Sequence, residues 1–536
     1  MTPNQRPIAP FHRITLAAFG IMAIVACYTV RPGQGGGNLS DRGKAPLDGT
    51  RKINPADIAL PKGYRIEAVA YGLTFPTGVA FDDKGQVFVL EGGYAYGERW
   101  DTARILQVLP NNLFVPVAVG DSNGPWTGMT YGPDPDHPGG KRGAFYVAEG
   151  GQLHGGRILK VTPAGKKTAL AEGMPSYGDH HTNGPAIGPD SMLYFSQGTA
   201  TNSGVVGLDN RGFGWMERFP AFHDIPCQDI TLTGVNYKTV NPFPTAGGKA
   251  GNKVETGAFS PYGTPSTAGQ VVKGEIPCNG AVMRIPLRGG KPELVAWGFR
   301  NPFALGFSKD GRLYVIDNGY DQRGSRPIWG AAELLWEVQR GVWYGWPDYS
   351  GSKTLSRSEF TPPHEERPAP LLQFPPGPPP AGTAEASTSG QVNASNHPPE
   401  PSAYFPVHSS ADGLDFSRSA AFGHEGEAFV ALFGDMAPSV GKVLEPVGFK
   451  IVRVDAATGI HEDFAVNRDG NGPASKLKSG GLERPVAVRF SPDGKSLYVV
   501  DFGVMAVSKF GPVPGKQTGV LWRIWKEDQA GAEGNP

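Results

Sequence analysis

The fold of this chain is decided by the stretch Trp297-Gly-Phe-Arg-Asn-Pro-Phe-Ala-Leu-Gly-Phe-Ser-Lys-Asp-Gly-Arg-Leu-Tyr-Val-Ile-Asp-Asn-Gly-Tyr-Asp-Gln-Arg-Gly324. Two short apolar runs in it are separated by the turn Lys309-Asp310-Gly311, and the second run ends in a polar loop. This order is typical of a β-hairpin with a functional loop at its end. Because Arg300-Asn301 and Asp317–Asp321 flank the hairpin, we expect a site built on a scaffold unit.

The same hairpin pattern recurs along the chain, each time as a small residue, an apolar strand, a turn and a second apolar strand. The six copies are Gly78–Val89, Gly128–Tyr131 with Ala144–Val147, Ala186–Phe195, Ala304–Val315, Gly413–Phe416 with Glu427–Val430, and Ala487–Val499. Further strands are expected at Gly156–Val161, Ala281–Ile285, Lys450–Val454 and Gly519–Ile524. Recurrence at intervals of roughly 50 residues or more predicts an all-β fold, a six-bladed β-propeller with four-stranded antiparallel blades. A β-sandwich with ordinary hairpins is the alternative.

The composition agrees with a turn-rich β protein, since the 536 residues include 76 Gly and 51 Pro and only 19% are charged. The formal net charge is zero and no basic run is present, so no nucleic-acid partner is expected.

The N-terminus has the layout of an export signal. Arg6 and Arg13 precede the apolar run Ile14–Val30, and the run includes Ile24-Val-Ala-Cys27, which is similar to a bacterial lipobox. Residues 1–30 are therefore expected to be a lipoprotein signal, a plain signal peptide or a membrane anchor. All three place the body outside the cytoplasm, in the periplasm, and two of them tether it to the membrane.

The rest of the chain divides into a linker, a body and a tail. Residues 31–55 form a Gly-rich linker, 56–526 the propeller and 527–536 the tail. Insertions are expected at about 201–280 and 352–402, and the run Pro375–Gly390 is too poor in apolar residues to order itself. Cys227 and Cys278 are the only cysteines of the body, and in an oxidising compartment they predict a disulfide, with two free thiols as the alternative.

Two clusters could carry chemistry. Gly178-Asp-His-His-Thr-Asn-Gly184 places His180 and His181 just before the third hairpin. Adjacent side chains of an extended chain point to opposite sides, so at most one of the two histidines is expected to face a given site, as a base or as loop packing. Arg300-Asn301 suits an oxygen-rich ligand, and the backbone carbonyls of Gly319 and Tyr320 suit calcium; a salt bridge and a tight turn are the alternatives.

A resemblance covers about residues 60–525. His180 followed by Gly188-Pro-Asp, then Arg300-Asn-Pro, Asp317-Asn-Gly-Tyr320 and Trp343-Tyr-Gly-Trp-Pro-Asp348, resembles the glucose/sorbosone dehydrogenase family of pyrroloquinoline quinone (PQQ) enzymes. The branch similar to sorbosone dehydrogenase also shares Gln197–Gly204 and the excursion from Cys227 to Cys278.

The resemblance implies a six-bladed propeller and a set of roles. His180 and Arg300 are the implied catalytic residues, His180 as the base and Arg300 aimed at the reacting quinone oxygen. Arg300 and Asn301 are implied to contact PQQ, and the carbonyls of Gly319 and Tyr320 to hold calcium. Arg484 is implied to bind the PQQ carboxylates. A polar glutamine beside the substrate is replaced by Asn123, a second arginine by Val486, and a lysine expected near Gly434 has no counterpart.

These roles lead to an expected activity. The chain is expected to be a quinoprotein that oxidises a sugar or aldehyde hydrate of the aldose or sorbosone type. It lacks a Cys-x-x-Cys-His motif, so electrons are expected to leave to an external acceptor. A propeller that only binds sugar or protein, and a calcium-dependent lactonase, are the alternatives.

Overall fold

The computed structural model describes residues 47–95, 99–137, 143–212, 214–243, 251–373, 397–436, 443, 445–508 and 511–527. The export signal with Cys27, most of the linker, the run Pro375–Gly390 and the tail beyond residue 527 lie outside these residues. Within them, no helix has the length and apolar character needed to cross a membrane.

Six antiparallel sheets form the blades of a β-propeller, as the six hairpin copies predict. Each inner strand contacts the inner strand of the next blade, and the contact of β31 with β3 closes the ring. Blades one to three are β3 (Pro76–Phe81), β4 (Val87–Glu91), β7 (Arg104–Leu109) and β8 (Leu113–Val119); β9 (Trp126–Pro133), β10 (Gly143–Glu149), β11 (Gly156–Val161) and β12 (Lys167–Met174); and β13 (Thr182–Ile187), β14 (Met192–Gln197), β19 (Ala281–Pro286) and β20 (Glu293–Trp297).

Blades four to six complete the circle. They are β21 (Pro302–Phe307), β22 (Leu313–Asp317), β23 (Glu333–Glu337) and β26 (Ala403–Phe405); β27 (Ala411–Phe416), β28 (Ala428–Leu432), β29 (Lys450–Val454) and β30 (His461–Asn467), extended by β1 (Ile58–Ala59); and β31 (Pro485–Phe490), β32 (Ser496–Asp501), β35 (Gly519–Lys526) and β2 (Tyr64–Leu73). Because β2 pairs with β35, the last blade joins the two ends of the body and leaves no open gap in the ring.

The middle strands read as short apolar runs because neighbouring blades cover both of their faces. β10 is buried at every position, whereas the outer strand β8 exposes Leu113, Val115 and Val119. Aromatic rings fill the space between blades: Phe88 and Phe145 of the first two blades lie 4.7 Å apart, edge to face. Such pairs contribute about 0.5–1.5 kcal/mol beyond the apolar area that they bury.

Small residues begin the repeats because the inner strands converge on a narrow channel. A Cβ atom on Gly128 would lie 2.1 Å from the carbonyl oxygen of Gly184 in the next blade. At Gly413 it would lie 2.7 Å from the Cα atom of Ala487. Only glycine permits this approach at these two positions.

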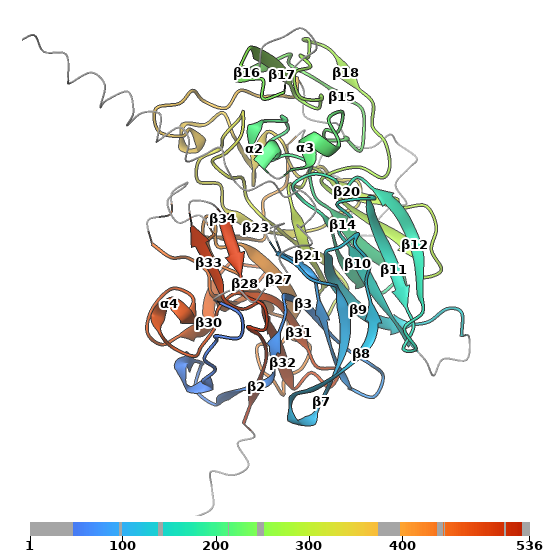
Figure 1. The fold of residues 1–536 in the computed structure, drawn as a ribbon, viewed down its shortest axis with the longest axis vertical. Coiled ribbons are helices and arrows are strands. Elements are labelled where there is room, and N and C mark those ends of the chain that lie inside the picture. Colours follow the sequence, from blue (N-terminus) through green and yellow to red (C-terminus); the bar gives the residue numbers. More distant parts are fainter. Residues whose placement is uncertain are drawn as a thin grey trace, which may run out of the picture.

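The insertion between β14 and β19 lies together at the top of the view in Figure 1. It contains α2 (Leu208–Gly212), α3 (Trp215–Arg218), β15 (Ile230–Thr231), β16 (Asn236–Val240), β17 (Lys253–Gly257) and β18 (Val271–Val272). Shorter elements elsewhere are β5 (Tyr94–Ala95), β6 (Arg99–Trp100), β24 (Tyr349–Ser350), β25 (Lys353–Thr354), α4 (Ala474–Leu477), β33 (Met505–Ser508), β34 (Gly511–Pro514), and the 3-10 turns Pro55–Asp57, Pro110–Asn112 and Ser358–Phe360.

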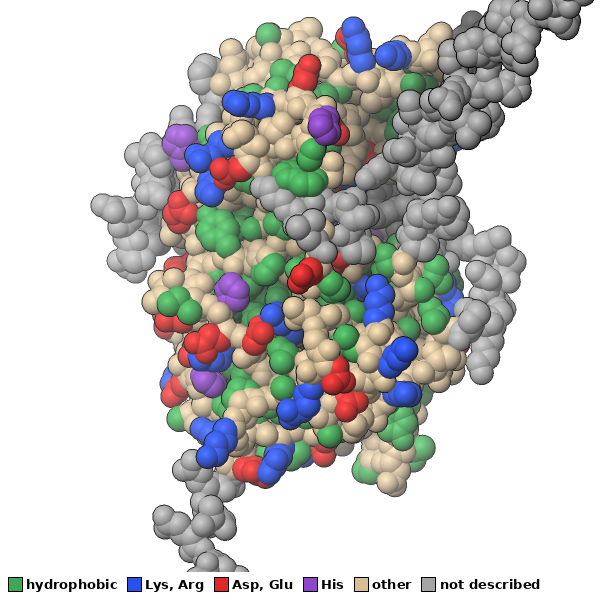
Figure 2. Space-filling view, turned by 90° about the vertical axis from the view of Figure 1, so that its left-hand side faces the viewer, with side chains coloured by type: hydrophobic (Ala, Val, Ile, Leu, Met, Phe, Trp, Pro, Cys, Tyr) green, Lys and Arg blue, Asp and Glu red, His purple; other side chains and the backbone are tan. Residues whose placement is uncertain are grey.

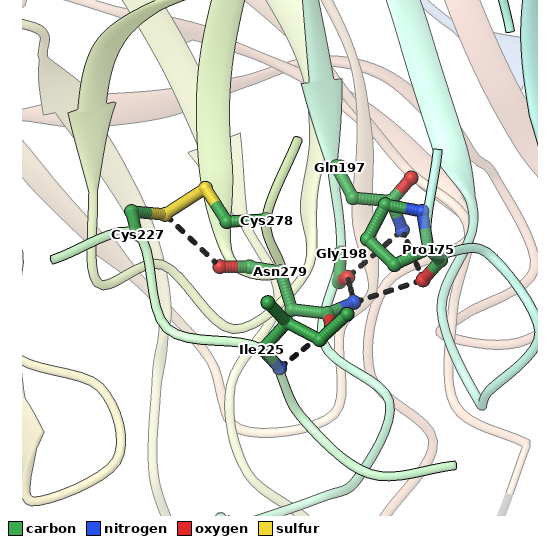
Figure 3. Close-up of a disulfide and its surroundings, with 7 residues drawn as sticks. All are labelled: Pro175, Gln197, Gly198, Ile225, Cys227, Cys278 and Asn279. Carbon is green, nitrogen blue, oxygen red and sulfur yellow. Dashed lines mark hydrogen bonds between the residues drawn. A yellow bond between two sulfur atoms is a disulfide. The ribbon is translucent and has the colours of Figure 1, made fainter. Parts of the chain in front are cut away.

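A disulfide joins Cys227 and Cys278 at the base of this insertion. Figure 3 shows that the next residue, Asn279, turns its side chain away from the bridge toward Pro175 and Gly198. Its Nδ2 atom donates hydrogen bonds to the carbonyl oxygens of both residues, at 2.9 Å each. The insertion is therefore tied to the start of blade three.

The surface carries no single-sign patch on the face drawn in Figure 2, where acidic and basic side chains are interspersed. This distribution agrees with the formal net charge of zero. It offers no extended basic surface of the kind that binds a phosphate backbone.

Candidate functional site

A cavity of about 240 Å³ lies at the N-terminal ends of the inner strands of the blades. Its walls come from blades one to six and from the loops that lead into them. Four of the residues to which the resemblance assigns a role line it: His180, Arg300, Asn301 and Gly319.

A ring of bulge residues forms the floor of this cavity. All six inner strands carry one extra residue near their start, and in five of them the residue left out of the strand pairing lines both the cavity and the channel below it. These residues are Thr77, Thr127, Phe303, Asp412 and Val486. β-bulges re-aim side chains in this way beside functional sites. Asp412 is the one charged member of the five.

His180 is held as a neutral base, and its Nε2 atom makes no hydrogen bond with the described residues. Its Nδ1 atom lies 2.8 Å from the carbonyl oxygen of Thr199. A carbonyl only accepts, so Nδ1 carries the proton and Nε2 carries the lone pair. Burial, followed by the charges of Arg300 and Arg323, lowers the pKa of His180 well below its ordinary value. The imidazole is therefore unprotonated at neutral pH.

His181 lines the cavity as well, so the expectation that at most one of the two histidines faces it is wrong. Alternation fails because residues 177–180 form a bend and β13 begins only at Thr182. Gly150 leaves room for the His181 ring, since a Cβ atom there would lie 3.1 Å from its Cγ atom. Burial lowers the pKa of His181 to about 4, and its Nδ1 atom makes no hydrogen bond with the described residues.

Asp224 anchors the segment that orients His180. Its carboxylate accepts hydrogen bonds from the backbone N–H of Ala200, at 2.6 Å, and from the hydroxyl of Thr201. Burial raises the pKa of Asp224 to about 7. The folded state therefore binds the proton of the Asp224 carboxyl more tightly than the unfolded chain does. The contribution of this proton to the free energy of unfolding is complete below about pH 4 and is lost as the pH rises through about 7.

We expect the midpoint of thermal unfolding to fall between pH 5 and pH 8, and Asp224→Asn to reduce that fall. The measurement is a series of thermal melts of both proteins, without added metal, at unit steps of pH. Equal slopes for wild type and Asp224→Asn would contradict the assignment of this pH dependence to Asp224.

Arg300 is fixed by an ion-pair network of buried and partly buried groups. Its Nη2 atom lies 2.7 Å from Asp321 Oδ2 and 2.9 Å from Asn202 Oδ1. Arg323 pairs with the same carboxylate at 3.0 Å and with Asp179 at 2.6 Å. Burial alone would raise the pKa of Asp321, but the two guanidinium groups outweigh it and hold the pKa well below its ordinary value.

Asparagines link the blades along one side of the cavity. Asn301 donates to Asn318 Oδ1 at 2.8 Å, and Asn318 donates to Asp412 Oδ1 at 3.2 Å. Asn183 donates to Asn301 Oδ1 at 3.5 Å, and its own Oδ1 atom, in a residue that is 2% exposed, has no partner among the described residues. The Asn183 Oδ1 atom is therefore available to a bound ligand.

Gly319 and Tyr320 differ in their positions. Gly319 lines the cavity and donates its N–H to Glu333 Oε2 at 2.8 Å. The Tyr320 side chain is buried in the core, and its hydroxyl donates to the carbonyl of Tyr349 at 2.8 Å. Among the described lining residues of the cavity, Tyr320 is absent.

Arg484 and Asn123 lie behind the cavity wall rather than in it. The guanidinium of Arg484 donates to the carbonyl oxygens of Gly434 and Asp435, at 2.8 and 3.1 Å, and lies 5.0 Å from the ring centre of Phe433. Asn123 is buried and donates to Glu149 Oε1 at 2.7 Å. In the described structure Arg484 supports the loop that lines the cavity, and Asn123 supports blade two.

Two further carboxylates face the cavity without a salt bridge in the described part of the chain. Glu333 and Asp412 are each 4% exposed. Burial raises the pKa of Glu333, and burial together with the charge of Glu333 raises the pKa of Asp412 to about 8. The position of Asp412 could have been found in the sequence, because it directly precedes the small residue Gly413 of the fifth repeat. Glu333 has no such signal.

His408 is another lining residue that the sequence patterns missed. It lines the cavity in a left-handed backbone conformation, with φ of 59°. Its Nδ1 atom lies 3.5 Å from Asp321 Oδ1, and its buried Nε2 atom has no partner among the described residues. Strained backbone of this kind persists where the surrounding structure holds it, commonly at functional sites.

The side chains that line the cavity match only some of the needs of a flat ligand with polar edges. Phe303, Phe433, Met436, Val486 and Phe502 supply an apolar lining. The described lining has five carboxyl groups and two guanidinium groups, and the latter already pair with Asp321. Burial raises the pKa of Asp412 to about 8, so this carboxyl is largely protonated at neutral pH, and the remaining carboxylates leave no guanidinium group of the lining free for a tricarboxylate such as PQQ. A cation beside the ligand would improve the fit. No group of three or more His, Cys, Asp or Glu poised for a metal occurs among the described residues.

Comparison with known proteins gives likenesses of structure only. No protein-family model and no curated protein matches the sequence. The holo form of the pyranose dehydrogenase PQQ domain from Coprinopsis cinerea is 17% identical and has a TM-score of 0.48, over 88% of this chain and 97% of that one.

Two further likenesses are equally remote. The PQQ-bound aldose sugar dehydrogenase from Streptomyces coelicolor is 14% identical, with a TM-score of 0.45, over 88% of this chain and 100% of that one. The apo form of the soluble aldose sugar dehydrogenase from Escherichia coli is 13% identical, with a TM-score of 0.45, over 87% of this chain and 100% of that one. Likenesses at this level carry no argument about activity.

Proposed function

We propose that this chain is a quinoprotein oxidoreductase that oxidises a sugar or aldehyde hydrate, of the aldose or sorbosone type, with PQQ and Ca²⁺. One observation carries the proposal: the neutral imidazole of His180 has no partner for its Nε2 lone pair among the described residues, and it lies with the fixed guanidinium of Arg300 at a cavity on the propeller axis. A base and an adjacent cation are what an alcohol oxidation asks of the protein.

The residues act in defined ways in this proposal. His180 Nε2 takes the proton of the substrate hydroxyl, while Thr199 keeps the ring in the required tautomer. Arg300, which Asp321 and Asn202 hold in place, favours negative charge on an oxygen beside it. PQQ, when bound, supplies the two-electron acceptor for the hydride that leaves the same carbon atom. The apolar lining excludes water from the reacting groups.

The residues for the cofactor follow from the resemblance in the sequence. Arg300 and Asn301 would contact PQQ, and the backbone carbonyls of Gly319 and Tyr320 would hold Ca²⁺. Arg484 would act on PQQ through the loop of Gly434 and Asp435, whose carbonyls it binds. We propose a periplasmic location with an N-terminal membrane tether, and an external electron acceptor.

Reconstitution tests the proposal. The purified protein is stripped with a chelator, loaded with PQQ and Ca²⁺, and followed by reduction of a dye with a panel of aldoses, sorbosone and simple aldehydes. Turnover that requires both additions supports the assignment. Binding of sugar without turnover would make the chain a binding propeller.

Calcium-dependent hydrolysis of lactones is the second candidate function. Glu333 and Asp412 favour it, because both carboxylates face the same cavity and a hydrolytic calcium site needs such groups around the metal. Release of acid from a lactone panel with Ca²⁺ and without PQQ, in place of dye reduction, would decide for this activity.

His408→Asn is expected to lower kcat/KM by about 3- to 10-fold, the effect of one lost hydrogen bond to the substrate, about 0.5–1.5 kcal/mol. Asparagine tolerates the left-handed conformation, so the backbone is kept. His364→Asn is the matched control, because His364 also has a positive φ, 66°, but is exposed and outside the cavity lining. Equal rates for both variants and wild type would exclude His408 from the site.

A further inference from the structure

One guanidinium group joins the insertion between β14 and β19 to the cavity. Arg323 Nη1 lies 2.6 Å from Asp209 Oδ2, in α2 of the insertion, and 2.6 Å from Asp179 Oδ2, in the cavity wall. The side chain of Arg323 is 15% exposed, and those of Asp179 and Asp209 are 1% and 11% exposed. Charge pairs that are shielded from water in this way interact more strongly than exposed pairs do.

The ion pairs continue from Arg323 to Arg300. Asp321 Oδ2 lies 3.0 Å from Arg323 Nε and 2.7 Å from Arg300 Nη2. Arg323 thus divides its N–H groups among three carboxylates, and one of the three, Asp321, also holds Arg300. A change at Asp209 therefore alters how Arg323 shares its charge with Asp321, and with it the support of Arg300.

The two short helices of the insertion meet the cavity wall in a fixed arrangement. Asn210 Nδ2, in α2, donates to both carboxylate oxygens of Asp179, at 3.0 and 3.1 Å. Trp215 Nε1, in α3, donates to Asp179 Oδ1 at 2.9 Å. Gly324 leaves room for the Asp209 carboxylate, since a Cβ atom there would lie 2.8 Å from both of its oxygen atoms.

The Asp209 carboxylate depends on Arg323 for a charged partner. Burial raises the pKa of Asp209, the charge of Arg323 opposes that rise, and the charge of Asp179 adds to it. The Asp209 Oδ1 atom is buried and has no hydrogen-bond partner among the described residues. A buried carboxylate with so few local partners is costly to keep, and such costs are expected at functional sites.

We infer that Asp209 is a positioning residue: through Arg323 and Asp321 it sets the direction of the Arg300 guanidinium, so that the insertion shapes the site. Asp209 is not among the described residues that line the cavity, so it acts without touching a ligand. The inference rests on the proposed function in taking Arg300 as a group that contacts the cofactor.

A double-mutant cycle tests the link without a cofactor. Unfolding in urea at pH 8 is measured for wild type, Asp209→Asn, Arg300→Gln and the double variant. The factor by which Arg300→Gln lowers the folding equilibrium constant should differ by about twofold or more between the wild-type and Asp209→Asn backgrounds, as for residues in one ion-pair network. Glu217→Gln, which changes a carboxylate of α3 in an exposed ion pair with Arg211, is the matched control and should be additive with Arg300→Gln.

Titration of the apoprotein with PQQ in the presence of CaCl₂ separates positioning from charge. Removal of a carboxylate would by itself favour an anionic ligand, whereas a displaced Arg300 binds such a ligand less well. We expect Asp209→Asn to bind PQQ about 3- to 10-fold more weakly than wild type, the effect of one lost hydrogen bond. Glu217→Gln should bind PQQ as wild type does.

The outcomes separate the positioning role from the activity. Additive effects of Asp209→Asn and Arg300→Gln on unfolding would overturn the inference, and so would equal or tighter binding of PQQ by Asp209→Asn. If wild type neither binds PQQ nor reduces the dye, the proposed function fails and the cycle alone decides the role of Asp209. Where circular dichroism shows that Asp209→Asn or Arg300→Gln fails to fold, Asp209→Ser or Arg300→Lys takes its place in the cycle.

Discussion

His180→Ala is expected to lower kcat by about 10²- to 10⁴-fold, the usual contribution of a positioned general base. The variant loses the only described imidazole whose Nδ1 atom is tied to the Thr199 carbonyl, and with it the lone pair at Nε2. Cofactor affinity should change little, because Arg300 keeps its bonds to Asp321 and Asn202. Steady-state dye reduction and PQQ titration measure the two quantities.

His181→Ala is the matched control, since its ring lines the same cavity from the adjacent position. It should retain kcat within about tenfold, because no oriented lone pair is assigned to it. The pH profile adds a second readout. The lowered pKa of His180 keeps the base unprotonated, so kcat should not fall between pH 8 and pH 6.5 through protonation of this residue. A kcat of His180→Ala near that of wild type would remove the proposed base.

Replacement of both Cys227 and Cys278 by serine is expected to lower the free energy of unfolding by about 4 kcal/mol. The bridge spans 51 positions of the sequence, and in the chain-entropy model a loop of this length contributes about that much. Denaturant unfolding of the serine variant and of wild type, each with and without a reducing agent, measures the difference.

In a denaturant titration, the same variant should also lose its activity at a lower denaturant concentration than wild type does. Asn279, next to Cys278, holds the carbonyl of Gly198, and Thr199 follows Gly198 in the chain. Loosening of the insertion therefore disturbs Thr199, whose carbonyl orients His180. Addition of a reducing agent to the serine variant should have no further effect. If the free energies of unfolding of wild type and of the serine variant agree within about 1 kcal/mol, the bridge restricts the unfolded chain very little.

The propeller could be predicted because its signal is local and repeated. Each hairpin copy falls on the first two strands of a blade, for example Ala304–Val315 on β21 and β22. Apolar runs, turns and small residues act over a few neighbouring positions, and six repetitions leave little ambiguity about the unit. The sequence does not show the bulges, because the extra residue changes the pairing without changing the apolar pattern.

The site could be predicted only where a residue lies beside a recognisable hairpin. His180, Arg300 and Asn301 precede inner strands and do line the cavity. Arg484 also precedes an inner strand, yet its guanidinium binds the carbonyls of the next loop. Side-chain direction at such a position depends on the bend of the backbone, which one residue type does not specify.

The amino-acid sequence by itself determined the architecture, the hairpin in Trp297–Gly324 as one blade of six, and the place of the functional groups at the strand entrances. Only the tertiary structure decided which groups meet. Glu333 is far in the chain from His408 and Asp412, and no shared motif joins the three residues. They face one cavity because the closed ring brings strand ends and loops from different blades to a common axis, and contacts across that axis leave no periodic trace in the sequence.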